Sequence, residues 1–293
     1  MDKLPYLFVD SVVGAFDRLP PPESISMLPE SQWQDSFREH DRCRIVLLLG
    51  LQYTNSGVKC FFNGLNRSTL KFTFDNLSIR EVFSRDQRFV RVHGIILRSE
   101  NSKHVPTNSI VEVFSEERTN TSLISYAMAQ LLPFNSVLHL LCRNPDHIEK
   151  VLNVCHKQKH FSILRLKHVG KISEDFLMDQ LKNSDHLQIM YLKGSWTRPV
   201  LRKLVNFRRK FQVELNMPLS EDILDIQLLE EFVRNFRRKS FKSVQMRLRT
   251  TLSDSEIGEI LPRCAEGQFL LSQPLVQWMG AILQGQSIFI SVN

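Results

Sequence analysis

The second half of the sequence repeats a short apolar pattern at intervals that suit one strand and one helix per unit. Triplets of the form apolar–x–apolar start 26, 26, 23 and 33 residues apart, at Leu138, Leu164, Met190, Val213 and Met246. Helical spacing of apolar residues fills the intervals, at 146–155, 174–183, 198–207 and 223–235. Start signals such as Asn144-Pro145 and Ser173 precede these helices.

A period of about 20–35 residues is typical of leucine-rich-repeat solenoids, because one strand–helix unit cannot bury both its apolar faces and a stack of units can. The sequence therefore predicts an α/β fold in which residues 118–293 form leucine-rich-repeat-like strand–helix repeats. An ordinary α/β sheet with crossover helices is the alternative.

Residues 43–117 predict a small antiparallel β region. Apolar runs at 44–53 and 58–62 flank Asn55, Ser56 and Gly57, which are typical hairpin-turn residues. Further strands are predicted at 70–74, 89–97 and 110–114.

Residues 1–42 predict a helical segment. A short amphipathic helix is expected after Pro5, the prolines at 20–22 break the chain, and a second helical stretch contains Trp33 and Phe37. The apolar residues of the first stretch are Leu4, Phe8, Val9, Val12, Val13 and Phe16.

Composition limits the partners and the compartment. The net charge is +7, but 38 Lys and Arg are scattered among 31 Asp and Glu, which disfavours a specific nucleic-acid partner. The number of Cys residues is five, which is odd, and no two of them form a Cys-x-x-Cys motif. The longest apolar run, 45–49, is too short to span a membrane. We therefore expect a cytoplasmic or nuclear protein with reduced thiols.

Two basic clusters lie in a five-residue sequence, Asn-Phe-Arg-Arg-Lys, that occurs at 206–210 and again at 235–239. Each follows a predicted helix end, where the helix dipole favours cations, and this local rule explains them better than phosphate binding does. They leave open an alternative function, binding of nucleic acid or of an acidic partner without an adaptor. The cluster residues are Arg208, Arg209, Lys210, Arg237, Arg238 and Lys239.

Motifs for catalysis, cofactor binding and metal binding are missing from the sequence. There is no Gly-x-Ser-x-Gly elbow and no Gly-rich phosphate loop. The densest group of possible metal ligands does not predict convergence on one ion, because its members fall on a strand end, a helix and a helix end. These residues are Cys142, His147, Cys155, His156 and His160. We expect no catalytic residue, no cofactor and no metal, and hence a non-enzymatic protein.

The N-terminal order of a Leu-Pro start, a helix of apolar residues and Trp33 near the end of a segment of about 40 residues resembles a degenerate F-box. With His40 and Arg44, the segment 57–60, the segment 88–92 and Ile95-Ile96, the chain is similar to a large nematode family of F-box and F-box-associated proteins. Two departures, Tyr6-Leu7-Phe8 and the prolines at 20–22, leave open a purely structural role for the helix.

The resemblance implies a substrate receptor of a cullin–RING ubiquitin ligase. The N-terminal helices would dock on a Skp-type adaptor, and the repeats would hold a protein substrate. The implied adaptor-binding residues are Leu4, Pro5, Phe8, Val9, Val12, Phe16 and Trp33. The polar residues inside the strand triplets would form the partner face, which leans basic and so slightly favours an acidic partner; they are His139, Arg165, Tyr191, Glu214 and Arg247.

Overall fold

A computed structural model shows an α/β protein whose chain divides into two compact units, Met1–Phe161 and Ser162–Asn293. The structure describes residues 4–16, 19–66, 69–99, 110–132, 134–156, 161–205, 212–217, 224–237, 243–261, 263–265, 268–273, 277–284 and 287–292. The first unit contains the predicted helical and β regions together with the first predicted strand–helix pair, and each unit is described below by itself.

The first unit begins with three helices, α1 (Tyr6–Gly14), α2 (Pro22–Ser26) and α3 (Gln32–Cys43). The predicted helix after Pro5 is confirmed. Pro22 opens α2, because proline is well suited to a first helical position. A small apolar core joins the three helices and consists of Val9, Val13, Ile25 and Phe37.

The sheet of the first unit is built on a hairpin of β1 (Ile45–Thr54) and β2 (Gly57–Leu65), as the sequence predicts. Thr54 lies opposite Gly57, and Gly57 has a φ of 127°, a conformation that favours glycine. Both β3 (Phe72–Leu77) and β5 (Glu112–Phe114) pair antiparallel with β2.

The prediction of a purely antiparallel region is wrong. Strand β4 (Val90–Leu97) pairs parallel with β1, and β6 (Val137–Leu140) pairs parallel with β4, so the sheet is mixed. Helix α4 (Ile79–Ser84) and a 3-10 turn (Gln87–Phe89) carry the chain back to the starting end of β1. Such a return makes the next strand parallel rather than antiparallel.

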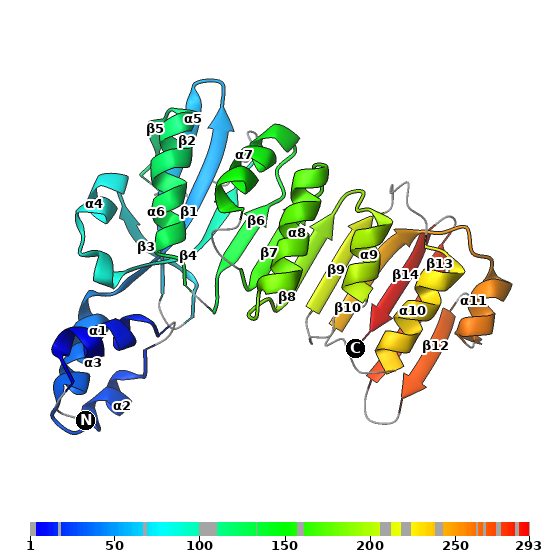
Figure 1. The fold of residues 1–293 in the computed structure, drawn as a ribbon, viewed down its shortest axis with the longest axis horizontal. Helices are drawn as coiled ribbons and strands as arrows, with labels where there is room; N and C mark the ends of the chain where they lie inside the picture. The colour runs from blue at the N-terminus through cyan, green and yellow to red at the C-terminus, as the bar shows by residue number, and fades with distance from the viewer. Residues whose placement is uncertain are drawn as a thin grey trace. The chain divides into compact units, whose positions relative to one another are not determined.

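Helices cover one face of this sheet (Figure 1). One continuous helical stretch consists of α5 (Glu116–Arg118), a π-helical segment (Thr119–Ile124) and α6 (Ser125–Ala129). Helix α7 (Pro145–Cys155) follows β6, and the side chain of Asn144 caps it by accepting from the amide of Asp146 at 3.0 Å. This cap confirms the predicted start signal.

The second unit starts with four parallel strands in chain order, β7 (Ile163–Lys167), β8 (Ile189–Lys193), β9 (Gln212–Met217) and β10 (Ser243–Arg249). All five predicted triplets, including the one in β6, therefore lie on strands. The connecting helices are α8 (Lys171–Asn183), α9 (Arg198–Val205) and α10 (Ile226–Arg237), which lie on the same face of these strands (Figure 1). Helix α8 begins at Lys171, three residues before the predicted first residue Glu174, so its N-cap is Gly170 and the predicted cap Ser173 lies inside the helix.

The strand–helix alternation ends after α11 (Asp254–Ile260). Strands β11 (Arg263–Ala265), β12 (Gln268–Gln273), β13 (Gln277–Gln284) and β14 (Ser287–Val292) pair antiparallel in succession, and β14 pairs antiparallel with β10. The predicted repeats extend to residue 293, and that prediction is wrong for these antiparallel strands. Gly267 and Gly285, which lie between short apolar runs, are the hairpin signals that could have predicted them.

Gly50 in the middle of β1 provides a test of packing in the first unit. It lies opposite Phe61 of β2, and a Cβ at position 50 would be 2.2 Å from the Phe61 ring. Phe61 is fully buried, so its ring cannot move into solvent. We expect Gly50→Ala to lower the free energy of unfolding by about 1–3 kcal/mol through overpacking, measured by urea denaturation.

The double variant Gly50→Ala/Phe61→Leu separates this contact from a general effect on the strand. A smaller ring-free side chain leaves room for the new methyl group, so the double variant should lose less stability than the sum of the two single variants. Strict additivity of the two losses would contradict the proposed contact.

Candidate docking surface on the N-terminal helices

Helix α1 carries apolar side chains on both its inner and its outer sides. Val9 and Val13 are buried against the core of the three helices. On the outer side, Leu7 is 71% exposed and Phe8 51%. Phe16, which follows the end of the helix, is 44% exposed, and its ring packs edge-on against Phe37 at 5.7 Å between ring centres. A surface helix normally presents polar residues to solvent, so this outer face is the exception that needs a functional explanation.

The structure places the implied adaptor-binding residues in three environments. Leu4, Pro5, Phe8 and Phe16 are exposed, and Val12 is half-buried between them. Val9 is 1% exposed and packs in the core, so its inclusion in the docking set is wrong. Trp33 is partly buried against the same core, and its buried indole N–H has no hydrogen-bond partner among the described residues.

Two further exposed apolar side chains of the N-terminal helical segment are absent from the predicted set. They are Leu7 on α1 and Met27, which follows α2 and is 84% exposed. The signal for Leu7 was present, because a residue adjacent to Phe8 on a helix whose other side carries Val9 and Val13 must face outward. We define the docking surface as Leu4, Leu7, Phe8, Val12 and Phe16.

Two arginines hold the C-terminal end of α1. Arg44 donates to the carbonyl oxygens of Phe16 at 2.6 Å and Val13 at 2.8 Å, and Arg91 of β4 donates to the Gly14 carbonyl at 2.7 Å. The last carbonyls of a helix have no partners within the helix and carry partial negative charge, so cationic donors stabilise them. The outer face of α1 is thereby fixed relative to the sheet of its own unit.

A buried carboxylate fixes α1 a second time, near its middle. Asp10 is 3% exposed and contacts Nε2 of His40 at 3.1 Å and the guanidinium of Arg88 at 3.1 Å, and it accepts from Ser36 Oγ at 3.3 Å. A buried carboxylate without such partners would destabilise the fold strongly. Because α1 is held by α3 and by the residues before β4, little conformational freedom is lost when a partner docks on it.

His40 sits at the centre of this polar network and is fully buried. Its Nδ1 lies 3.1 Å from the Arg44 guanidinium, which can only donate, so Nδ1 accepts and Nε2 carries the proton toward Asp10. Burial is the main cause that lowers the pKa of His40 below its usual value, and the positive charge of Arg44 lowers it further. The carboxylate of Asp10 acts in the opposite direction but is outweighed. The imidazole is therefore held neutral.

A polar hollow lies beside the docking surface, between α1 and α3. It is lined by Tyr6, Asp35, Arg38, Glu39 and Arg42, and the Tyr6 hydroxyl donates to the Glu39 carboxylate at 2.5 Å. This hydrogen bond, together with burial, raises the pKa of Tyr6 to about 12. The hollow gives the docking surface a polar border of mixed charge, which is typical of interface rims.

The potential metal ligands of the sequence analysis lie in separate environments. Cys142 donates to the carbonyl of Asn144, Cys155 lies beside Met128, and the ring of His147 stacks on Tyr53 at 4.6 Å. No group of three possible ligands that could hold a metal ion occurs in the parts of the chain described above. His156 follows α7, and His160 lies outside the described residues.

The predicted partner face is partly assembled in the second unit. Arg165 lies opposite Tyr191 and Tyr191 opposite Glu214 on adjacent strands, on the face that the helices leave open, since Leu164 and Leu166 are buried on the other. On β10, Arg247 lies opposite Asn216 of β9, and Gln245 is the residue that lies opposite Glu214. Nothing of the Arg247 side chain is described. His139 lies half-buried on β6, in the first unit.

The basic clusters cannot be placed. Arg237 is the last residue of α10, and its side chain is not described. The others lie outside the described residues; they are Arg208, Arg209, Lys210, Arg238 and Lys239.

The comparisons with known proteins add no assignment. No protein-family model matches this chain, and neither the search of curated proteins nor the search of solved structures found a match. Within the described residues, no helix is both long enough and apolar enough to cross a bilayer. The resemblance to F-box proteins therefore stays a prediction, and the docking surface has to be judged on its own geometry.

The pH dependence of stability tests the neutral, buried state of His40. In the unfolded chain His40 has its ordinary pKa of 6.5, whereas in the folded chain the pKa is lower. As pH falls below 6.5 the unfolded state takes up a proton that the folded state does not, so folding loses stability by at most about 1.4 kcal/mol per pH unit from this group.

His40→Gln keeps one donor and one acceptor but cannot titrate. We expect its free energy of unfolding, measured by urea denaturation between pH 7.5 and 5.5, to fall less steeply with pH than that of the wild type. Equal slopes for the two proteins would show that His40 does not titrate between the folded and unfolded states.

Proposed function

We propose that this chain is an F-box-like substrate receptor of a cullin–RING ubiquitin ligase, and that the docking surface on α1 binds a Skp-type adaptor. The observation that carries the proposal is the concentration of exposed apolar side chains at the N-terminus. Of the ten most exposed large apolar side chains in the described residues, five are Leu4, Leu7, Phe8, Phe16 and Met27. Such an apolar patch on an otherwise polar surface marks an interaction site.

The geometry of the patch favours helix-in-groove binding. Phe8 and Val12 lie four residues apart on α1, which places them along one side of the helix. Leu4 and Phe16 continue the four-residue interval in the segments that flank the helix. Their helix is anchored from behind by Val9, Val13 and the arginine contacts to its last carbonyls. A rigid row of apolar anchors suits an apolar groove on a partner.

The kind of adaptor comes from the sequence resemblance, and the exposure of Phe8 and Phe16 supports it. In this proposal the chain catalyses nothing itself. Ubiquitin transfer belongs to the partner subunits of the ligase, and the chain positions a protein substrate. The proposal requires two separate binding surfaces, one for the adaptor and one for the substrate.

We place the substrate on the second unit. Strands β7–β10 and helices α8–α10 alternate in chain order with all the helices on one face, and we propose that they form a short leucine-rich-repeat-like array. The open face presents Arg165, Tyr191 and Glu214 side by side. Aromatic and Arg side chains are the types most enriched at protein interfaces.

Adaptor binding is tested with the full chain and a purified Skp-type adaptor in a biolayer interferometry assay. We expect the wild type to bind and Leu7→Ala/Phe8→Ala to bind at least about tenfold more weakly, because truncating exposed apolar anchors removes more than about 1 kcal/mol each at an interface centre. The two side chains are exposed, so the double variant should fold with nearly unchanged stability.

The matched control is Phe83→Ala, which removes a phenyl ring that is 40% exposed elsewhere in the first unit. It should bind the adaptor as the wild type does. Absence of binding by the wild type, or equal loss in the control and the α1 variant, would refute the adaptor proposal.

The substrate surface is tested by site-specific photo-crosslinking in cells. A photoreactive phenylalanine analogue at Tyr191 should form adducts with a partner protein, because this position lies at the centre of the open face. The same analogue at Asp175, on the exposed side of α8, is the control. Adducts at both positions in equal yield, or at neither, would contradict the assignment of this face.

A further inference from the structure

A second group of exposed apolar side chains surrounds β5 in the first unit. Val113 is 52% exposed, Ile110 43% and Val111 38%, and Phe83 of α4 is 40% exposed. These four residues and the docking surface on α1, together with Met27, include nearly all of the most exposed large apolar side chains in the described parts of the chain. The function proposed above makes no use of this second group.

Strand β5 lies at an edge of its sheet. In the described residues it pairs only with β2, so one side of its backbone has no strand beside it there. Natural edge strands are usually protected by Lys, Pro, a bulge or a very short length, and β5 itself has only three residues. The run Ile110-Val111-Glu112-Val113-Phe114 contains no Lys and no Pro. Its composition therefore suits the addition of a further strand.

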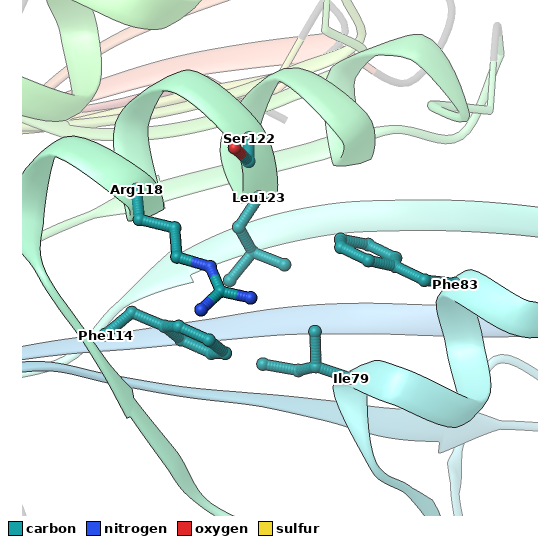
Figure 2. Close-up of a pocket in the computed structure, with 6 residues that line it drawn as sticks. All are labelled: Ile79, Phe83, Phe114, Arg118, Ser122 and Leu123. Carbon is teal, nitrogen blue, oxygen red and sulfur yellow. The ribbon is translucent and has the colours of Figure 1, made fainter.

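A small hollow opens next to this strand (Figure 2). It is lined by Ile79, Phe83, Phe114, Arg118, Ser122 and Leu123. Figure 2 shows Ile79, Phe114, Leu123 and Phe83 around a common space, with the Arg118 side chain directed into it. The hollow is too small for a metabolite, and it suits the tip of one apolar side chain.

Arg118 brings a positive charge to this hollow. Its guanidinium lies 4.5 Å from the centre of the Phe114 ring, and it forms no ion pair within the described residues. The nearby carboxylates have other partners, because Glu116 accepts from Lys150 at 2.7 Å and Glu112 accepts from the Ile79 amide at 2.7 Å. The exposed carboxylate of Glu117 lies on the preceding residue of the same helix and does not line the hollow. A carboxylate from a partner can therefore pair with Arg118.

We propose that β5 and this hollow bind an extended peptide segment of a partner protein by strand addition. The backbone of the segment pairs with the free edge of β5, one apolar side chain enters the hollow, and a neighbouring Asp or Glu pairs with Arg118. Backbone hydrogen bonds supply affinity, while the hollow and the guanidinium select an apolar residue close to an acidic one. This surface acts whether or not the N-terminal helices bind an adaptor.

The test uses a phage-displayed library of random seven-residue peptides, panned against the full chain. The proposal predicts enrichment of peptides that carry an apolar residue within two positions of Asp or Glu. A synthetic peptide of the enriched pattern, followed by fluorescence anisotropy, should lose at least about tenfold in affinity for Arg118→Glu, because a charge-assisted hydrogen bond is replaced by repulsion.

The Arg118→Glu variant is expected to fold. Arg118 is the third residue of a helix whose N-cap is Ser115, and the Ser115 hydroxyl accepts from the Arg118 amide. A Glu at this position completes a Ser-x-x-Glu capping box, which stabilises a helix start. The matched control is Arg80→Glu, which reverses an exposed charge on α4 that does not line the hollow.

A second variant tests the strand edge itself. Val113→Lys places a charge on β5, as protected edge strands do, and should also weaken the peptide at least about tenfold. The control Arg80→Glu and the α1 variant Leu7→Ala/Phe8→Ala should bind the peptide as the wild type does. Panning that enriches no apolar–acidic pattern, or an enriched peptide that binds Arg118→Glu as well as the wild type, would overturn the proposal.

Discussion

The burial of the Asp10 carboxylate is the constraint on which the N-terminal part of this protein depends. A buried carboxylate must be surrounded by donors, and here they come from His40 and Ser36 of α3 and from Arg88 before β4. Arg44 and Arg91 add contacts to the last carbonyls of α1. Because the partners of Asp10 come from α3 and from the 3-10 turn before β4, α1 cannot change its position without leaving a buried charge unpaired.

This arrangement explains how a short helix can expose large apolar side chains and still keep a defined position. Val9 and Val13 contribute only part of its attachment, and the polar contacts contribute the rest. The outer face is therefore free for a partner. Strand β5 also exposes apolar side chains, and it is held in place by its pairing with β2. In both places polar contacts hold the backbone while apolar side chains remain exposed.

Much of this fold is predictable from the sequence where the signal is local. The apolar–x–apolar triplets fall on strands, Gly57 closes the predicted hairpin, and Asn144 caps the predicted helix α7. What depends on distant partners was not predictable. The parallel pairing of β4 follows from the path of the chain through α4, and the pairing of β14 beside β10 joins strands separated by α11 and three other strands. The inward orientation of Val9 is decided by Phe37 and Ile25, because α1 is apolar around most of its circumference.

In the candidate site, too, the features with a local sequence signal were predictable and those that depend on distant residues were not. The sequence indicated an apolar N-terminal helix and a polar partner face, and the helical interval could have placed Leu7 outward once Val9 and Val13 were known to face the core. That Val9 and Val13 face the core depends on α2 and α3, which helical spacing within α1 does not reveal. The most direct measurement of the central claim is titration calorimetry of the full chain with a purified Skp-type adaptor at two or more temperatures. The account predicts saturable 1:1 binding with a negative heat-capacity change, the mark of apolar surface being buried. Absence of binding, or binding with no change in heat capacity, would contradict it.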